Sequence, residues 1–312
     1  MKLYVGVDIG GTHTKITAVR SDGTVSTRFQ VKTQDSIGCP VEKVNYWIDE
    51  ISSALDTFIS QTNQRVEMVG VAAPGLVDRD ECSIAHMPGR LEGLEHLNWR
   101  EKLNFELPVP VINDAQAALL AESWIGAVQG VKNVVLLTLG TGVGGALMLN
   151  GQVFSGARGR AGHIGHISLD LDGTPDICGM PGSLEEFMGQ GSLEKRTRGK
   201  YRCYDKLLED YNYGNLYAEE IWLRSVRALA TGIGSVINVL DPDMILLGGG
   251  ISVADQLIGP LSSFLDEVEW RPGGESVPIR TTELGAYSGA IGAARKAMLY
   301  HTSSLRLQNN NN

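Results

Sequence analysis

The stretch Asp8-Ile9-Gly10-Gly11-Thr12-His13-Thr14 decides the fold class of this chain. It lies between an apolar run, Leu3 to Val7, and an alternating run, Lys15 to Val19, which both predict β-strands. A tight turn between two strands can present successive backbone N–H groups to an anion. An acidic residue such as Asp8 beside that turn indicates a cation between carboxylate and anion, as Mg²⁺ is held on a nucleotide. Taken alone, the stretch also fits an ordinary hairpin turn.

A second stretch with the same plan supports the nucleotide interpretation. Gly140-Thr141-Gly142-Val143-Gly144-Gly145 follows the apolar run Val134 to Leu139 and precedes Ala146 to Leu149, which is too short for a helix. The repeated plan predicts two related lobes. These glycines match GxGxxG, but a dinucleotide site needs a helix directly after the turn, and the run that follows here is too short for one. The P-loop pattern GxxxxGK[ST] does not occur in the sequence. A third glycine turn, Gly248-Gly249-Gly250, follows another apolar run.

The composition limits the class of protein. The chain has 312 residues, which predicts about two domains, and 38 glycines, about 12% against an average near 7%. A net charge of −9 does not provide the basic face that nucleic acid requires. The four cysteines are far apart, which predicts reduced thiols in a cytoplasmic protein, and neither a signal peptide nor a membrane span is expected.

Strands alternate with helices along the chain, which predicts an α/β fold. A buried strand, Val109 to Ile112, ends in Asn113-Asp114 and runs into an alanine-rich helix, Ala115 to Trp124. Open α/β sheets place ligands at the carboxyl ends of their strands, so Asp114 is a candidate catalytic carboxylate. An Asn-Asp pair before a helix is also a common N-cap, and the two roles are compatible.

These segments resemble, in order and over nearly the whole chain, the ROK family of bacterial sugar kinases (repressors, open reading frames, kinases). Five motifs carry the resemblance: Asp8 to Lys15, Asn113 to Ala115, Leu139 to Gly145, Gly156 to His166, and Leu247 to Gly250. The resemblance implies a two-lobed, actin-like ATPase (ribonuclease H-like) α/β fold with mixed sheets and a cleft between the lobes. It implies an N-terminal lobe of residues 1–114 and a C-terminal lobe of residues 115–312, whose last helix packs back on the first lobe.

The resemblance also implies an activity: ATP-dependent phosphorylation of a hexose hydroxyl, with glucose to glucose 6-phosphate the most common case in the family. Asp114 would accept the hydroxyl proton, and Asp8 would hold Mg²⁺ through water. The positions implied to bind the nucleotide are Asp8, Gly10, Gly11, Thr12, Thr14, Lys15, Thr138, Gly140, Thr141, Gly142, Gly248, Gly249 and Gly250. The positions implied to bind the sugar are Gly75, Asn113, Gly156, His163, His166 and Glu185.

The chain departs from the family pattern at the sugar site. Family members carry Glu-x-Gly-His where this chain has His163-Ile164-Gly165-His166, and a proline-asparagine turn where it has Pro88-Gly89. A histidine can donate as well as accept a hydrogen bond, unlike the glutamate that it replaces. Glu185 keeps the position of a second sugar-binding glutamate. An N-acetylhexosamine kinase is therefore an alternative, as are kinases of fructose, mannose or allose.

In the family, a structural zinc is bound by the last histidine of the Glu-x-Gly-His motif and by three cysteines in a CxCGxxGC run. Here that run is Asp176-Ile177-Cys178-Gly179-Met180-Pro181-Gly182-Ser183, so one cysteine of three is kept, with His166 and Asp176 as further donors. Structural zinc normally has four cysteine or histidine ligands. We therefore expect no structural zinc, and we expect His166 to bind sugar or to form hydrogen bonds within its loop.

Three further alternatives concern the donor, the class of protein and its assembly. Polyphosphate is a possible donor in place of ATP. A sugar-responsive regulator without a DNA-binding part is the alternative from another class. Regulators of the family carry an N-terminal helix-turn-helix, for which a first motif at residue 8 leaves no room, and this favours the kinase branch. Family members are often dimers or tetramers, so a homo-oligomer is expected.

Overall fold

The computed structural model describes residues 1–33, 46–62, 64–87, 91–103 and 105–310. These residues form two compact units. The first consists of Met1–Gly130, Ser155–Ala161 and Glu283–Asn312, and the second of Val131–Phe154 and Gly162–Thr282. The expected division at residue 114 therefore differs from the observed one, because the helix that begins at Asp114 packs within the first unit.

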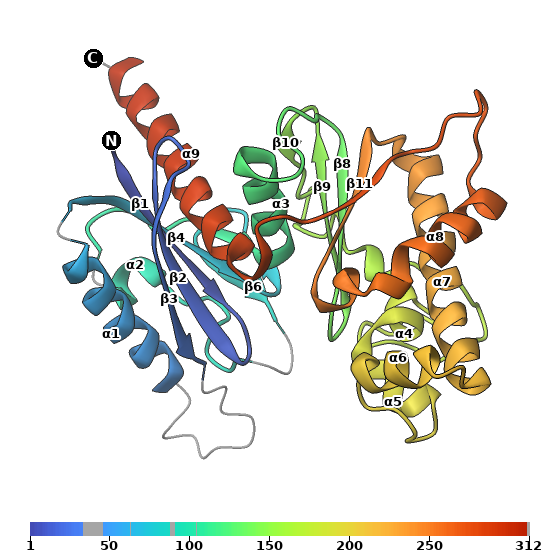
Figure 1. Cartoon of the computed structure of the whole chain (residues 1–312). Helices are drawn as coiled ribbons and strands as arrows, with labels where there is room; N and C mark the ends of the chain where they lie inside the picture. The colour runs from blue at the N-terminus through green and yellow to red at the C-terminus, as the bar shows by residue number, and fades with distance from the viewer. Residues whose placement is uncertain (34–45, 63, 88–90, 104, 311–312) are drawn as a thin grey trace. The chain divides into compact units, whose positions relative to one another are not determined.

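The first unit is built on a mixed five-stranded sheet with the order β3-β2-β1-β4-β7. Strands β1, β2, β3 and β4 are labelled in Figure 1. Its strands are β1 (Leu3–Ile9), β2 (His13–Arg20), β3 (Val25–Lys32), β4 (Val66–Ala73) and β7 (Val111–Asn113). Strands β1, β2 and β3 pair antiparallel, whereas β4 and β7 continue the sheet parallel to β1. The unit also contains a small β5 (Leu76–Val77) and β6 (Ile84–His86) pair, with helices α1 (Tyr46–Gln61), α2 (Trp99–Lys102), α3 (Asp114–Ile125), η4 (Gly285–Tyr287) and α9 (Ser288–Asn310).

Helix α9 packs on β1, β4 and α3 almost backbone to backbone. A β-carbon added at Gly6 of β1 would lie 1.9 Å from the Ala290 carbonyl oxygen, and one at Gly70 would lie 2.2 Å from that of Ala293. Glycines in the strands and small residues in the helix are therefore what allow this close approach. The helix predicted near the end of the chain is present, and it belongs to the first unit.

Helix α3 makes polar contacts with both of the later segments of the first unit. Glu122, which is fully buried at the end of α3, accepts hydrogen bonds from the backbone N–H groups of Glu283 (3.0 Å) and Leu284 (2.9 Å). The Ser155 hydroxyl donates to Gln116 Oε1 of α3 at 3.2 Å. Helix α3 is thus the element on which the returning segments are fixed.

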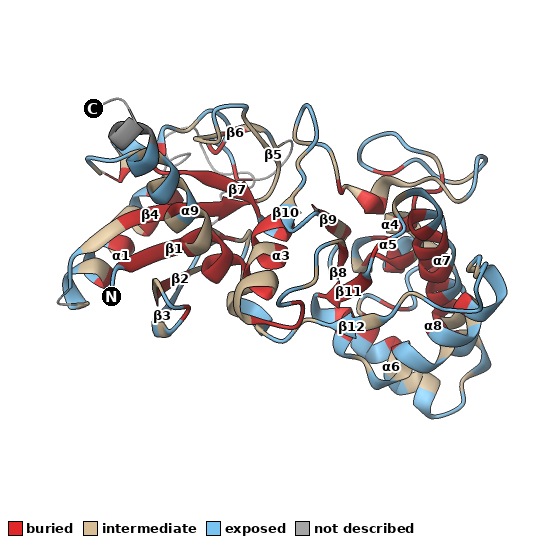
Figure 2. Cartoon of the chain, turned by 90° about the horizontal axis from the view of Figure 1, so that it is seen from above, coloured by how far each residue is buried: buried red, intermediate tan, exposed pale blue. Residues whose placement is uncertain are grey.

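The second unit contains another mixed five-stranded sheet, with the order β10-β9-β8-β11-β12. Its strands are β8 (Val134–Leu139), β9 (Val143–Leu149), β10 (Gln152–Val153), β11 (Met244–Gly248) and β12 (Ile279–Thr281). The helical elements are η2 (Ile164–His166), α4 (Leu184–Met188), α5 (Gln190–Arg196), α6 (Tyr204–Asn212), α7 (Leu216–Leu240), η3 (Gly250–Val253) and α8 (Asp255–Val268). Strands β1, β4 and β8 are mostly buried (Figure 2).

The two sheets share one topology, as the repeat in the sequence predicts. In each, three antiparallel strands are followed by two strands parallel to the first. The first hairpin of each unit, β1–β2 and β8–β9, encloses one of the two glycine-rich stretches. Among the described residues, none of the helices is sufficiently long and apolar to cross a bilayer.

Candidate active site

Two carboxylates mark the site of the first unit. Asp8 lies near the carboxyl end of β1, and Asp114 directly follows β7 as the first residue of α3. Because β1, β4 and β7 are parallel, their carboxyl ends share one edge of the sheet. Burial raises the pKa of Asp8 to about 7, with a further contribution from the negative charge of Asp114. A divalent cation would stabilise the charged form of such a pair, so these residues fit the predicted magnesium role.

Lys15 and Gly289 complete the surroundings of Asp8. Lys15 is the cross-strand partner of Asp8 in the β1–β2 hairpin, and its positive charge lowers the pKa of Asp8 against the two larger effects. Gly289 of α9 leaves the space that the carboxylate occupies, because a β-carbon there would lie 2.6 Å from Asp8 Cγ. No local pattern indicated that Gly289 would contact Asp8, since the two residues lie 281 positions apart in the chain.

Asn113 is the N-cap of α3. Its Oδ1 accepts hydrogen bonds from the backbone N–H groups of Ala115 (3.0 Å) and Gln116 (3.3 Å), and its Nδ2 donates to the Gly75 carbonyl at 3.1 Å. The capping role proposed from the sequence is therefore present, and it leaves one amide N–H of Asn113 for a ligand. Asp114 itself is exposed as the first residue of α3.

The first glycine turn is closed by a hydrogen bond from the Gly10 N–H to the His13 carbonyl at 3.1 Å. Gly11, Thr12 and Lys15 are partly or fully exposed. Thr14 is completely buried, and its hydroxyl pairs with that of Thr33 at 2.8 Å. Strand β2 alternates its side chains, so the Thr14 side chain faces the interior, and its predicted nucleotide contact would be made by the backbone.

Gly75 and Gly156 are the predicted sugar-side positions of the first unit. Both have a positive φ, 101° and 73°, which a residue with a side chain adopts only with strain. A β-carbon at Gly75 would also lie 2.6 Å from the His86 carbonyl oxygen. The Pro88-Gly89 turn, which we expected to lack a sugar contact, lies outside the described residues.

In the second unit, the turn between β8 and β9 is held by backbone hydrogen bonds. Gly140 donates to the Gly142 carbonyl at 3.0 Å, and the carbonyls of Gly140 and Thr141 accept from the N–H groups of Gln190 (3.0 Å) and Gly191 (2.7 Å) at the start of α5. Thr138, the last predicted nucleotide contact before this turn, is partly buried in β8.

The third glycine turn meets the second. A β-carbon added at Gly249, whose φ is 86°, would lie 2.3 Å from the Leu139 carbonyl oxygen at the end of β8. Strand β11, which ends at Gly248, pairs parallel with β8, so both turns leave the same edge of the sheet. The predicted nucleotide positions 138, 140–142 and 248–250 are thus together in the second unit.

Glu185 contacts the second turn directly. Its Oε2 accepts a hydrogen bond from the Val143 N–H at 2.9 Å, and a β-carbon at Gly142 would lie 2.2 Å from the same oxygen. Glu185 was predicted to bind sugar, and the structure adds a bond that the sequence did not indicate. This bond fixes helix α4, which carries Glu185, on the β8–β9 turn.

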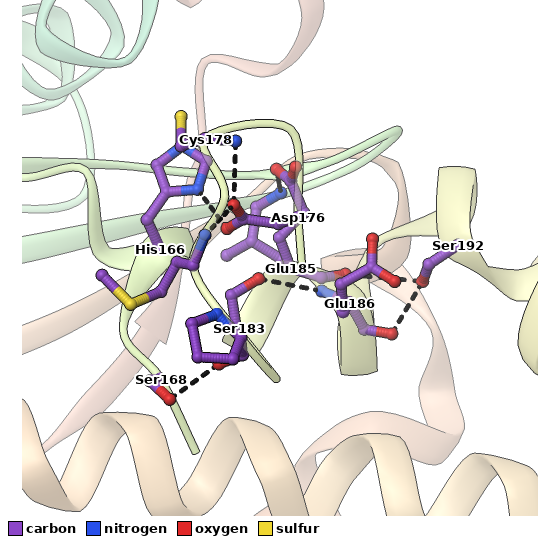
Figure 3. Close-up of polar contacts among 11 residues, drawn as sticks. His166, Ser168, Asp176, Cys178, Ser183, Glu185, Glu186 and Ser192 are labelled. Atoms are coloured by element: carbon purple, nitrogen blue, oxygen red, sulfur yellow. Dashed lines mark hydrogen bonds and ion pairs between the residues drawn. The ribbon is translucent and has the colours of Figure 1, made fainter. Parts of the chain in front are cut away.

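His163 and His166 lie at the two ends of η2 with nearly parallel rings, whose centroids are 6.3 Å apart at an interplanar angle of 15°. His166 Nδ1 is 2.7 Å from Asp176 Oδ2, and its Nε2 is 3.5 Å from Cys178 Sγ (Figure 3). Burial alone would raise the pKa of Asp176, but hydrogen bonds from His166, Ser183, Met180 and Cys178 outweigh it, so the pKa is lowered.

The donor atoms of His166, Asp176 and Cys178 lie within 4.8 Å of one another, so we tested them against the zinc that the family resemblance implies. Both oxygens of Asp176 already accept hydrogen bonds: Oδ1 from the N–H groups of Cys178 (2.8 Å) and Met180 (3.0 Å), and Oδ2 from His166. One cysteine, one histidine and one engaged carboxylate do not match the four-ligand set of a structural zinc site. The donor set therefore does not fit that metal.

The predicted positions thus form two groups. Asp8, the first glycine turn, Gly75, Asn113, Asp114 and Gly156 belong to the first unit, whereas the other two glycine turns, His163, His166 and Glu185 belong to the second. Three groups that contact the predicted site residues were not identified from the sequence: Thr33, Gly289 and the Val143 N–H. Each acts through a contact that only the folded chain creates.

Known proteins resemble this chain over most of its length. The model of the ROK family matches residues 4–299. The chain is 31% identical to a glucokinase of Halalkalibacterium halodurans and 29% identical to an N-acetylmannosamine kinase of Haemophilus influenzae, each over 93% of both chains. It is 27% identical to a ROK family glucokinase from Streptomyces griseus solved with glucose and AMPPNP, with a TM-score of 0.76 over 95% of this chain and 99% of that one. The fold is therefore the actin-like ATPase fold of these kinases, and the chain belongs to the ROK family.

Proposed function

We propose that the protein is an ATP-dependent sugar kinase that transfers the γ-phosphoryl group to a hexose hydroxyl, with glucose as the first candidate acceptor. The observation that carries the proposal is the carboxylate pair of the first unit. Asp8 and Asp114 lie at the carboxyl ends of parallel strands and interact electrostatically. The glucokinase relative and the Streptomyces griseus structure with glucose and AMPPNP support the choice of acceptor and donor.

The two carboxylates would have different roles. Phosphoryl transfer has a loose transition state, so catalysis depends on position and electrostatics. Asp114, which is exposed at the start of α3, would accept the hydroxyl proton as the sugar oxygen bonds to the γ-phosphorus and the bond to the bridging oxygen of ADP breaks. Asp8 would hold Mg²⁺ through water, and this cation neutralises charge on the phosphates.

The glycine turns would bind the nucleotide through their backbone. In the first unit Gly10, Gly11, Thr12 and Lys15 lie beside Asp8, and in the second the turns at 140–142 and 248–250 leave one edge of a sheet. Turns of this kind bind anions through N–H groups that need no side chain. Gly75, Asn113, Gly156, His163, His166 and Glu185 are the proposed sugar contacts.

An N-acetylhexosamine is the second candidate acceptor. His163 replaces the glutamate of the family pattern, and its ring lies parallel to that of His166. An imidazole can donate a hydrogen bond to an acetamido oxygen, which a carboxylate cannot do. The N-acetylmannosamine kinase of Haemophilus influenzae supports this alternative.

An ADP-release assay over a panel of sugars tests both candidates. We expect turnover that depends on ATP, Mg²⁺ and one sugar, and a loss of about 100- to 10,000-fold in kcat for Asp114→Asn, because the general base is removed. Glu106, an exposed acid of the same unit, supplies the matched control Glu106→Gln. If wild-type protein binds sugar but does not turn it over, the protein is a sugar-responsive regulator. If Asp114→Asn retains full kcat, the base assignment is wrong.

A further inference from the structure

Asp176 is a buried carboxylate in an exposed loop. Its side chain has no exposed surface, whereas the neighbouring Ile177 is 77% exposed and Leu171 is 85% exposed. Removing a carboxylate from water is costly unless hydrogen bonds replace the lost hydration. The loop therefore places its one buried acid where donors surround it.

Three donors converge on this carboxylate: His166 Nδ1 and the backbone N–H groups of Cys178 and Met180 (Figure 3). The Ser183 side chain also lowers the pKa of Asp176. His166 comes before the loop and Ser183 comes after it, so Asp176 interacts with both of its ends. Hydrogen bonds to a charged acceptor are roughly twice as strong as neutral ones.

The same contact selects one tautomer of the neutral His166 ring. An ionised carboxylate can only accept, so the 2.7 Å contact with Asp176 requires the proton on Nδ1. In the neutral ring, Nε2 is then the acceptor, and it lies on the side of Cys178 Sγ, 3.5 Å away. A side chain predicted to bind sugar is thereby given one tautomer and one orientation.

Ser183 extends the network to helix α4. Its side chain lowers the pKa of Asp176, and its oxygen accepts a hydrogen bond from the Glu186 N–H at 3.4 Å as the N-cap of α4. That helix carries Glu185, whose Oε2 accepts from the Val143 N–H at 2.9 Å. Asp176 is thus connected both to His166 and to the start of the helix that holds Glu185.

We propose that Asp176 is a positioning residue which, without a metal ion, orients His166 and anchors the start of α4 for sugar binding. The part concerning sugar rests on the function proposed above. The part concerning the tautomer does not, so the two can fail separately.

The first experiment reads the tautomer by long-range ¹H–¹⁵N NMR of the full chain. In the wild type we expect the His166 Nδ1 to carry the proton, and in Asp176→Ala we expect the Nε2–H form to gain population. Asp172→Asn, which changes an exposed acid of the same loop, should leave the His166 signals unchanged. A wild-type ring protonated on Nε2, or the same tautomer in Asp176→Ala, would overturn the proposal.

The second experiment separates orientation from loss of stability. We expect Asp176→Ala to raise KM for the sugar about 10- to 100-fold, the range for outer residues that orient a ligand-binding histidine, with KM for ATP unchanged. Asp176→Asn, which keeps an acceptor, should restore part of the sugar KM. In the background of His166→Ala, Asp176→Ala should add little, since coupled residues are not additive. The proposal is contradicted if Asp176→Ala raises the sugar KM as much in the His166→Ala background as in the wild type. It is also contradicted if Asp176→Ala alone leaves the sugar KM unchanged.

The third experiment asks whether a metal can take over this role. Replacing Asp176 and Ser183 together by cysteine would leave one histidine and three cysteines, a common zinc set. We expect the double variant to bind about one zinc per chain and its sugar KM to rise with a zinc-selective chelator, whereas the wild type should be insensitive. Stoichiometric zinc in the wild type that is lost in Asp176→Asn would identify Asp176 as a metal ligand and refute the proposal.

Discussion

The β1–β2 and β8–β9 hairpins have the same topology but different chemistry. The first places a charged pair, Asp8 and Lys15, in register across its two strands. At the position corresponding to Asp8, the second has Thr138, and its turn is held by backbone bonds to α5 and by Glu185. Two hairpins of one topology can therefore form different sites. The first carries charged side chains, and the second is a turn held in place by backbone hydrogen bonds. The difference follows from which side chains flank the turn.

The largest expected effect separates the two hairpins by charge. Asp8→Asn should lower kcat about 100- to 1,000-fold, because the proposed holder of Mg²⁺ loses its charge. Thr138→Val, the matched change in the second hairpin, should act mainly on KM for ATP and much less on kcat, because Thr138 is a predicted nucleotide contact that carries no charge. Both are measured by ADP release at saturating sugar. Equal effects of the two variants would mean that the hairpins are chemically equivalent.

The next effect tests the rigidity of the second hairpin. Gly142→Ala should raise KM for ATP about tenfold, because its β-carbon would displace the Glu185 carboxylate from the Val143 N–H. Gly140→Ala is the control within the same turn, since a β-carbon there meets nothing within 4 Å and its φ is not positive. Matching KM values for the two variants would show that the Glu185 contact does not hold the turn.

The electrostatics of the first hairpin predict a pH dependence of stability. Asp8 has a pKa of about 7 in the folded protein and 3.8 as its ordinary value, so the folded state retains a proton that the unfolded chain releases. Its contribution is fully present below pH 4 and is lost as the pH rises through about 7. The free energy of unfolding of the ligand-free protein should fall by about 2–4 kcal/mol over this window.

Urea unfolding at a series of pH values measures the slope of the free energy of unfolding against pH. Asp8→Asn, which cannot titrate, should remove that part of the slope, and Mg²⁺ with nucleotide should reduce it by favouring the charged form. Asp56→Asn is the control, because Asp56 is an exposed acid on helix α1 of the same unit. An unchanged slope in Asp8→Asn would mean that the titrating group lies elsewhere.

The smallest expected effect concerns Lys15. Because its charge lowers the pKa of Asp8, Lys15→Met should move the Asp8 titration to higher pH, as followed by NMR of the carboxyl carbon. Lys2→Met changes another lysine of the same unit, which no contact places beside Asp8, and should leave the titration where it is. A downward movement in Lys15→Met would show that the pair does not interact as its register indicates.

Most of the fold could be predicted from the sequence because it depends on local patterns. Both hairpins, the helix after Asn113 and the small-residue helix near the end were predicted from periodicity and glycine spacing. The division between the units was not, since α3 belongs to the first unit through contacts with α9 that join residues far apart in the chain. The orientation of Thr14 was also missed, because its buried partner Thr33 belongs to no common motif.

The sequence by itself determined the repeated strand–turn–strand plan and the carboxylates at strand ends, which follow from residue type and spacing. The loss of the family's cysteines is instead what the resemblance to the ROK family implies for the run Asp176 to Ser183. Only the tertiary structure decided that Gly289 makes room for Asp8, that Glu185 braces the β8–β9 turn, and that Asp176 occupies the centre of its loop. Each of these depends on distances between segments that are remote in sequence, and such distances are set by packing rather than by spacing along the chain.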